Sequence, residues 1–225
     1  MIKPAQKEQL KDAQIIFDQV LEGMGFVPNS LKMMTHKPNI LGGFITLFAN
    51  IKGFSHSQVS TLTALRVFLK TVRWTMKAKK STHQEVPHYL KDLIAHVSSN
   101  ASGCRYCQAH TALEAHIHGA DIEKIEAVWD FQTSPLFSDK EKAALSFALA
   151  AGAVPNFVTA EHHAELEKHY TPAQIVEIVS TISVFGFLNR WNDSMMTPLE
   201  EKPLDFASQH LKKGGWEAGK HKRHI

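Results

Sequence analysis

The sequence predicts an all-α fold, and three observations lead to that prediction. Apolar residues recur at helical spacing through most of the chain. Patterns of a capping Ser or Thr with Glu or Gln three residues later mark helix starts at 55–58, 138–141 and 171–174. The chain also lacks runs of alternating apolar and polar residues joined by hairpin turns, so no strand is predicted.

In the N-terminal part, the predicted helical segments cover residues 6–21, a short stretch from 28, 38–53 and 55–79. Gly23 and Gly25 end the first, because glycine leaves helical geometry at little cost. Pro28 and Pro38 suit the first turns of the next two. The capping pattern at 55–58 begins the fourth helix.

In the C-terminal part, the predicted helices cover residues 86–99, 104–118, 121–129, 140–151 and 172–191. Gly119 ends the second of these, and Asp121 caps the third. Pro172 stands in the first turn of the last helix, which is apolar nearly all round. A helix of that kind is predicted to be central to the fold.

Composition predicts one soluble domain. The 225 residues are 44% hydrophobic and 21% charged, and they can bury a full core. We predict a single all-α domain over residues 1–211 and a basic, flexible tail over 212–225. The tail holds five cationic residues against Glu217, a net charge of +4, so the rest of the chain is near −1. Because no basic face is spread over the body, we predict no nucleic-acid partner.

No targeting or membrane segment is predicted. Residues 1–10 lack the apolar core of a secretory signal. The longest apolar stretch, 173–188, contains Gln174 and Glu177 and is too short and too polar to span a bilayer. A single Cys-x-x-Cys fits a reducing cytosol, so we expect a cytoplasmic protein without a membrane partner.

Cys104 and Cys107 are the only cysteines in the chain, and they stand at the start of a predicted helix. A disulfide between them would close a loop too small to stabilise the fold much. The spacing therefore predicts reversible dithiol chemistry. The positive end of a helix favours thiolates, and this physics alone favours Cys104, expected to be the more exposed thiol, as the nucleophile.

Three side chains could serve the thiols as acid or base. His110 lies within one helical turn after Cys107. Asp92 and His96 lie one turn apart on the preceding helix, and either would reach the cysteines if the two helices packed as a hairpin.

Other interpretations of the pair stay open. Both cysteines can simply fill a core. A zinc site would combine Cys104 and Cys107 with two of His110, His116 and His118. Covalent haem is disfavoured, because no His directly follows the second cysteine.

Residues 90–94, 100–103 and 104–111 resemble the carboxymuconolactone decarboxylase/alkylhydroperoxidase D-like family, most of all its peroxidase-related branch. The last of these stretches reads Cys-Arg-Tyr-Cys-Gln-Ala-His-Thr, and weaker matches follow in family order over about residues 10–205. The resemblance implies an alkylhydroperoxidase D-like helical bundle that assembles as a homo-oligomer, commonly a trimer or hexamer. It also implies an antioxidant-type, thiol-dependent peroxidase or disulfide reductase, and the sequence requires no cofactor or metal.

The resemblance also implies roles for residues. The family's second cysteine, matching Cys107, attacks the peroxide, and Cys104 resolves the product to a disulfide. The family's Glu matches Asp92, while its His matches Thr111, with His110 one place earlier. The proton relay is accordingly predicted to join Asp92 and His110, with His96 or water as alternatives.

The sequence thus predicts a peroxidase that uses a peroxide substrate and an external dithiol reductant. Two other classes stay open. One is a lactone-decarboxylating enzyme of the same family, against which the cysteine pair argues. The other is a non-catalytic oligomeric or zinc-binding module.

Overall fold

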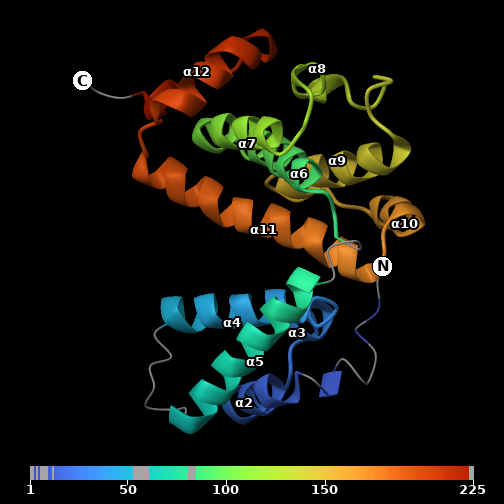
Figure 1. Ribbon diagram of the computed structural model, residues 1–225, viewed down its shortest axis with the longest axis vertical. Helices are drawn as coiled ribbons and strands as arrows, with labels where there is room; N and C mark the ends of the chain where they lie inside the picture. Colours follow the sequence, from blue (N-terminus) through green and yellow to red (C-terminus); the bar gives the residue numbers. More distant parts are fainter. Residues whose placement is uncertain are drawn as a thin grey trace. The chain divides into compact units, whose positions relative to one another are not determined.

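The computed structural model is all-helical, with no strand, over the residues that it describes: 3, 5, 10–11, 13–52, 61–80 and 85–222 (Figure 1). The all-α prediction is confirmed. The chain divides into two compact units, residues 2–85 and 86–225. This differs from the single domain predicted over 1–211, so each unit is described by itself.

Among its described residues, the N-terminal unit contains the helices α2 (Gln14–Met24), α3 (Asn29–Met34), α4 (Pro38–Lys52) and α5 (Thr61–Lys80). Its core consists of Ala13, Ile16, Phe17, Leu31, Leu41 and Trp74. Gly25 ends α2 in the left-handed conformation, φ 77°, as predicted. The capping pattern at 55–58 and part of the predicted helix start near residue 6 lie outside the described residues.

The α5 helix also exposes a series of apolar side chains: Leu62, Leu65, Phe68, Leu69, Val72 and Met76. Apolar area of this extent is typical of a surface that meets a partner. The homo-oligomer stays a prediction.

The C-terminal unit contains seven α-helices among its described residues: α6 (His88–Ala101), α7 (Arg105–Ile117), α8 (Ile122–Glu126), α9 (Asp139–Gly152), α10 (Ala160–His169), α11 (Pro172–Met195) and α12 (Glu201–His210). The α6 helix lies at the centre, packed against α7, α9 and α11, and residues 93–99 are all buried. Gly152 permits the close approach of α9, because a Cβ there would lie 2.6 Å from the Ser98 carbonyl oxygen.

The two capping patterns predicted in this unit are present. Ser138 and Glu141 cap α9 reciprocally, and Thr171 and Gln174 do the same for α11. Each box satisfies backbone N–H groups that a helix start leaves unpaired, so these starts are locally determined.

The α11 helix is buried along one side only and is not covered on all sides as its composition suggested. Its buried face includes Ile178, Asn189 and Asn192, whereas Phe187 and Trp191 are exposed. At 24 residues it is longer than the apolar stretch that the sequence marked, and by length and composition it could cross a membrane, with 33% of its apolar window buried. Buried amides on the packed face are typical of a protein interior. The absence of a membrane partner stays a prediction.

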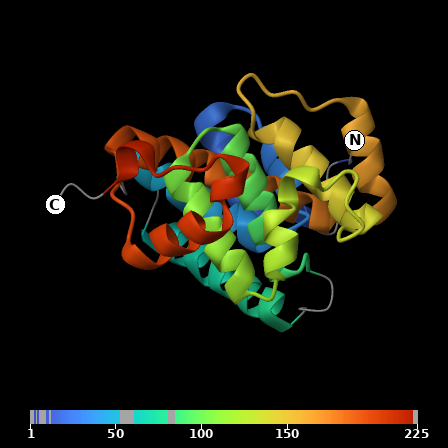
Figure 2. The ribbon, with the colours of Figure 1, turned by 90° about the horizontal axis from the view of Figure 1, so that it is seen from above.

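Residues 212–222 do not form the flexible tail that their charge predicted. Trp216 and His221 are buried, and the Trp216 indole Nε1 donates a hydrogen bond to the Arg105 carbonyl oxygen at 3.1 Å. The α12 helix packs on α7. This arrangement can be followed in the view from above in Figure 2. The lysines of this segment face solvent, while its Trp and His side chains turn inward.

Candidate active site

Cys104 is the N-cap of α7, directly after Gly103 in the left-handed conformation at φ 81°. Its Sγ accepts a hydrogen bond from the Cys107 backbone N–H at 3.3 Å. The two cysteine side chains lie 3.1 Å apart as free thiols. Both are buried, with Cys104 at 0% and Cys107 at 2% exposure, so Cys104 is not the more exposed thiol that the sequence led us to expect.

The surroundings of the two thiols shift their pKa values in opposite directions. A hydrogen bond from the Cys107 side chain lowers the pKa of Cys104, and a second one from the Cys107 backbone N–H lowers it further. Burial acts in the opposite direction and raises this pKa. Donating that hydrogen bond raises the pKa of Cys107 far above its usual range, and burial raises it further. The pair therefore holds its first thiolate on Cys104 and its remaining proton on Cys107.

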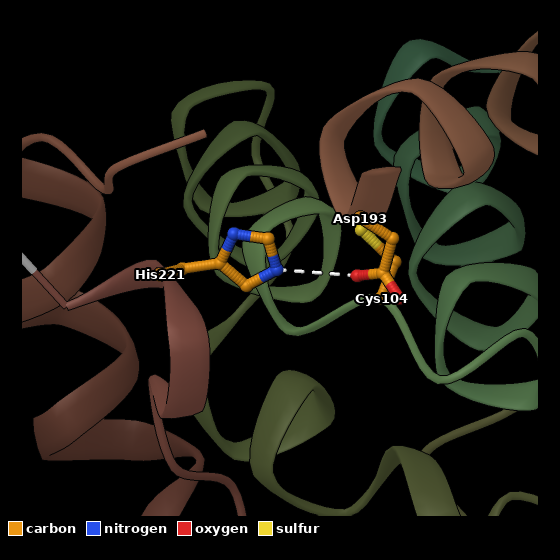
Figure 3. Close-up of side chains that lie close together, drawn as sticks. All are labelled: Cys104, Asp193 and His221. Atoms are coloured by element: carbon orange, nitrogen blue, oxygen red, sulfur yellow. Dashed lines mark hydrogen bonds and ion pairs between the residues drawn. The ribbon is translucent and has the colours of Figure 1, made fainter. Parts of the chain in front are cut away.

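The C-terminal end of α11 contacts both cysteines. The Asn192 side-chain Nδ2 donates to Cys107 Sγ at 3.4 Å. Asp193 lies against Cys104, and the Cys104 Sγ, an Asp193 carboxylate oxygen and a His221 ring nitrogen all lie within 4.8 Å of one another (Figure 3). Burial acts to raise the pKa of Asp193, but Lys220 and His221 outweigh it and hold that pKa below its usual value.

His110 and Asp92, which were predicted to form one proton relay, each interact with a different residue. His110 Nε2 lies 2.8 Å from Glu200 Oε2, and the Tyr106 hydroxyl donates to the same carboxylate at 3.0 Å. Asp92 Oδ2 lies 2.6 Å from Nδ1 of His118. Across the described part of the chain, no hydrogen bond connects Asp92 or His110 to either sulfur. Their catalytic role stays a prediction that this geometry does not support.

His96 is fully buried in α6 beside the helix that carries the thiols. Its Nδ1 contacts the Gln108 carbonyl oxygen at 3.0 Å and Thr111 Oγ1 at 3.2 Å. Burial lowers the pKa of His96 to about 4, so its ring is neutral near pH 7. Thr111 in turn donates to the Cys107 carbonyl oxygen at 2.7 Å. His96 therefore supports the α7 backbone below the thiols and does not hydrogen-bond to a sulfur.

The zinc ligands predicted from the sequence do not come together. His110 pairs with Glu200, His118 pairs with Asp92, and the His116 ring contacts the Ala120 carbonyl oxygen. Successive side chains on a helix are rotated by about 100° about its axis, so these three histidines lie on different parts of the α7 surface and do not meet at one site.

Sequence reasoning missed three residues of the site: Asn192, Asp193 and His221. A run of polar residues, 189–193, at the end of an otherwise apolar helix was an available signal for the first two. The sequence offers no such signal for His221, because this residue lies in a basic segment more than a hundred residues from the cysteines.

A cavity of about 560 Å³ lies beside Asp193 and is lined in part by Ser102, Asn189, Arg190 and Lys220, while neither cysteine lines it. The Asn189 side chain is 3% exposed, and neither its Nδ2 nor its Oδ1 has a hydrogen-bond partner among the described residues. Since a buried amide without partners is costly, this side chain is suited to bind a polar group of a ligand in the cavity.

Three comparisons relate this chain to known proteins. Residues 68–150 match the carboxymuconolactone decarboxylase family. The crystal structure of the debrominase Bmp8 is 29% identical, with a TM-score of 0.54 over 93% of this chain and 97% of that chain. A cysteine-to-alanine variant of Bmp8 in complex with 2,3,4-tribromopyrrole matches at 29% identity, with the same TM-score and 96% of its chain covered. The uncharacterised protein YnjA of Escherichia coli K12 is 30% identical over 97 residues, 43% of this chain.

The fold and the site define an all-α protein with a buried dithiol at the start of α7, beside the central helix α6. Residues 68–150 match the carboxymuconolactone decarboxylase family, so this part of the chain agrees with the family that the sequence led us to predict. The alignment with YnjA spans only about half of that relative's length. Placement in the peroxidase-related branch stays a prediction.

Proposed function

We propose that the protein is a dithiol oxidoreductase that transfers two electrons from Cys104 and Cys107 to a peroxide. The observation that carries this proposal is the pair itself: two free, buried cysteines at the start of α7 that lie 3.1 Å apart. A disulfide needs an S–S distance of about 2.05 Å, so little movement closes the bond. A peroxidase would require an external dithiol to restore the thiols, and we propose that it acts in the cytoplasm.

The reaction proceeds in two balanced steps. A thiolate attacks the terminal oxygen of the hydroperoxide, the O–O bond breaks, and a sulfenic acid forms on the cysteine, while the departing alkoxide takes up one proton and leaves as an alcohol. The second thiol then attacks the sulfenic sulfur, a disulfide forms, and water leaves. An external dithiol reduces that disulfide by exchange.

The geometry favours Cys104 as the attacking thiol. Its sulfur caps α7 and accepts both the backbone N–H and the thiol of Cys107. The family resemblance implies the opposite order, with Cys107 attacking. We propose the order that the local electrostatics favour, because the thiolate is the nucleophilic form of cysteine.

A second candidate is reductive removal of bromine from a brominated aromatic ring. The two thiols would supply two electrons, so that the carbon–bromine bond is replaced by carbon–hydrogen and a disulfide and bromide form. The match to a debrominase over nearly the whole chain supports it. The cavity also supports it, because about 560 Å³ is far more than a simple peroxide needs. Lactone decarboxylation has no comparable support, since it needs no dithiol.

A single-turnover experiment tests the proposal and separates the candidates. The fully reduced protein, freed of reductant, is mixed with cumene hydroperoxide or with 2,3,4-tribromopyrrole. We expect one hydroperoxide to be consumed for every two thiols lost, with the mass decreasing by two hydrogens. Bromide release with the same thiol loss would favour the second candidate. Thiols that persist with both compounds would exclude both.

A further inference from the structure

Two groups outside the predicted relay lie beside Cys104. Its Sγ, a carboxylate oxygen of Asp193 and a ring nitrogen of His221 share one small region, all within 4.8 Å of one another. Figure 3 shows the His221 ring directed at the Asp193 carboxylate, with Cys104 immediately beside that carboxylate. Cys104 and His221 are both at 0% exposure, whereas the Asp193 side chain between them is 34% exposed.

We propose that His221, positioned by Asp193, is the acid–base residue that serves Cys104 during reduction of the substrate. The proposal rests on the proposed dithiol chemistry. It assigns to the C-terminal segment the role that sequence reasoning gave to Asp92 and His110.

Both ring nitrogens of His221 face hydrogen-bond acceptors. Its Nδ1 lies 2.8 Å from the Thr197 carbonyl oxygen, and its Nε2 lies 3.2 Å from Asp193 Oδ1. Both oxygens only accept hydrogen bonds, so a ring that carries a proton on each nitrogen satisfies both. A cation beside Cys104 stabilises its thiolate and carries a proton that can be donated.

The remaining charged and titratable neighbours fit this arrangement. Lys220 Nζ lies 3.0 Å from Asp193 Oδ2, which keeps the carboxylate ionised and offsets its repulsion of the thiolate. From α7, Cys107 holds its proton toward Cys104, and the Tyr106 ring lies 5.8 Å from the His221 ring. Asp193 and Lys220 also line the cavity, so a ligand there would meet this end of the site.

The proton transfers balance. When the Cys104 thiolate breaks the O–O bond, the departing alkoxide takes the Nε2 proton of His221 and leaves as alcohol. The now neutral ring accepts the proton of Cys107, which attacks the sulfenic sulfur. The displaced hydroxide takes that proton from His221 and leaves as water.

The test compares His221→Ala with His210→Ala, a control in which the histidine is also paired with a carboxylate, Glu126 at 2.9 Å. Two readouts are followed against pH: single-turnover peroxide reduction, and alkylation of Cys104 by iodoacetamide. We expect His221→Ala to slow peroxide reduction at pH 7 by about 10²–10⁴-fold and to move the alkylation midpoint to higher pH. Free imidazole should restore part of the rate. His210→Ala should behave as the wild type.

Asp193→Asn keeps the shape of the side chain and covers the case in which His221→Ala does not fold. Losing the carboxylate that holds the His221 ring should lower the peroxide rate and change its pH profile relative to the wild type. Profiles of Asp193→Asn or of folded His221→Ala that overlay the wild type would overturn the proposal. So would the expected loss appearing in His110→Ala instead. Because alkylation does not depend on peroxide, failure of the peroxidase proposal alone would leave the alkylation shift intact.

Discussion

Replacing Cys104 by serine is expected to abolish peroxide reduction, by about 10⁴-fold or more, since the reaction loses its attacking thiolate. The hydroxyl of serine is not ionised near neutral pH, and Cys107 alone holds its proton because burial raises its pKa. Rapid-mixing measurement of peroxide loss, with trapping of sulfenic acid and mass spectrometry, checks the result. Sulfenic acid that forms on Cys107 of this variant at the wild-type rate would restore the order implied by the family resemblance.

Replacing Cys107 by serine is expected to have a different effect. Cys104 should still react once with peroxide and then stop as a sulfenic acid, because no internal thiol can resolve it. Steady-state turnover should be lost while one equivalent of peroxide is still consumed.

The matched variant Cys107→Ala separates resolution from electrostatics. Serine keeps an O–H donor beside Cys104, whereas alanine removes it. Since the hydrogen bond from Cys107 is the main cause of the lowered Cys104 pKa, the alanine variant should alkylate with a midpoint at higher pH than the serine variant. Equal midpoints would show that the side chain at 107 does not set the acidity of Cys104.

The parts of the fold that sequence predicted are those with local causes. The starts of α9 and α11 follow from the side chains of Ser138 and Thr171, which bond to backbone groups only three residues away. The cysteine pair at the start of α7 is equally local, because Gly103 ends the preceding turn and Cys104 caps the next helix. Such signals can be read without knowledge of the tertiary fold.

The α12 helix was not predicted, because it lacks such a local start signal. Its N-cap is Glu200, whose side chain makes no capping hydrogen bond. No start signal therefore distinguishes it from a loop. Its place is set by packing on α7, which sequence spacing does not show.

The two cysteines of the candidate site could be predicted from the sequence, whereas the groups that surround them could not. Spacing along α7 identified both cysteines, but it also suggested His110, whose side chain pairs with Glu200. The groups that do approach Cys104 come from the end of α11 and from residue 221. Contacts between segments this far apart follow from tertiary packing, so neither periodicity nor a motif could reveal them.

The equilibrium between the dithiol and the disulfide tests the central claim most directly. The protein is incubated in dithiol redox buffers of graded potential, and the Cys104–Cys107 disulfide is quantified by alkylation and mass spectrometry. The account predicts a reversible two-electron transition with a midpoint between about −270 and −120 mV, the range of redox-active pairs. A pair that stays reduced throughout, or a midpoint below about −300 mV as in structural disulfides, would contradict it.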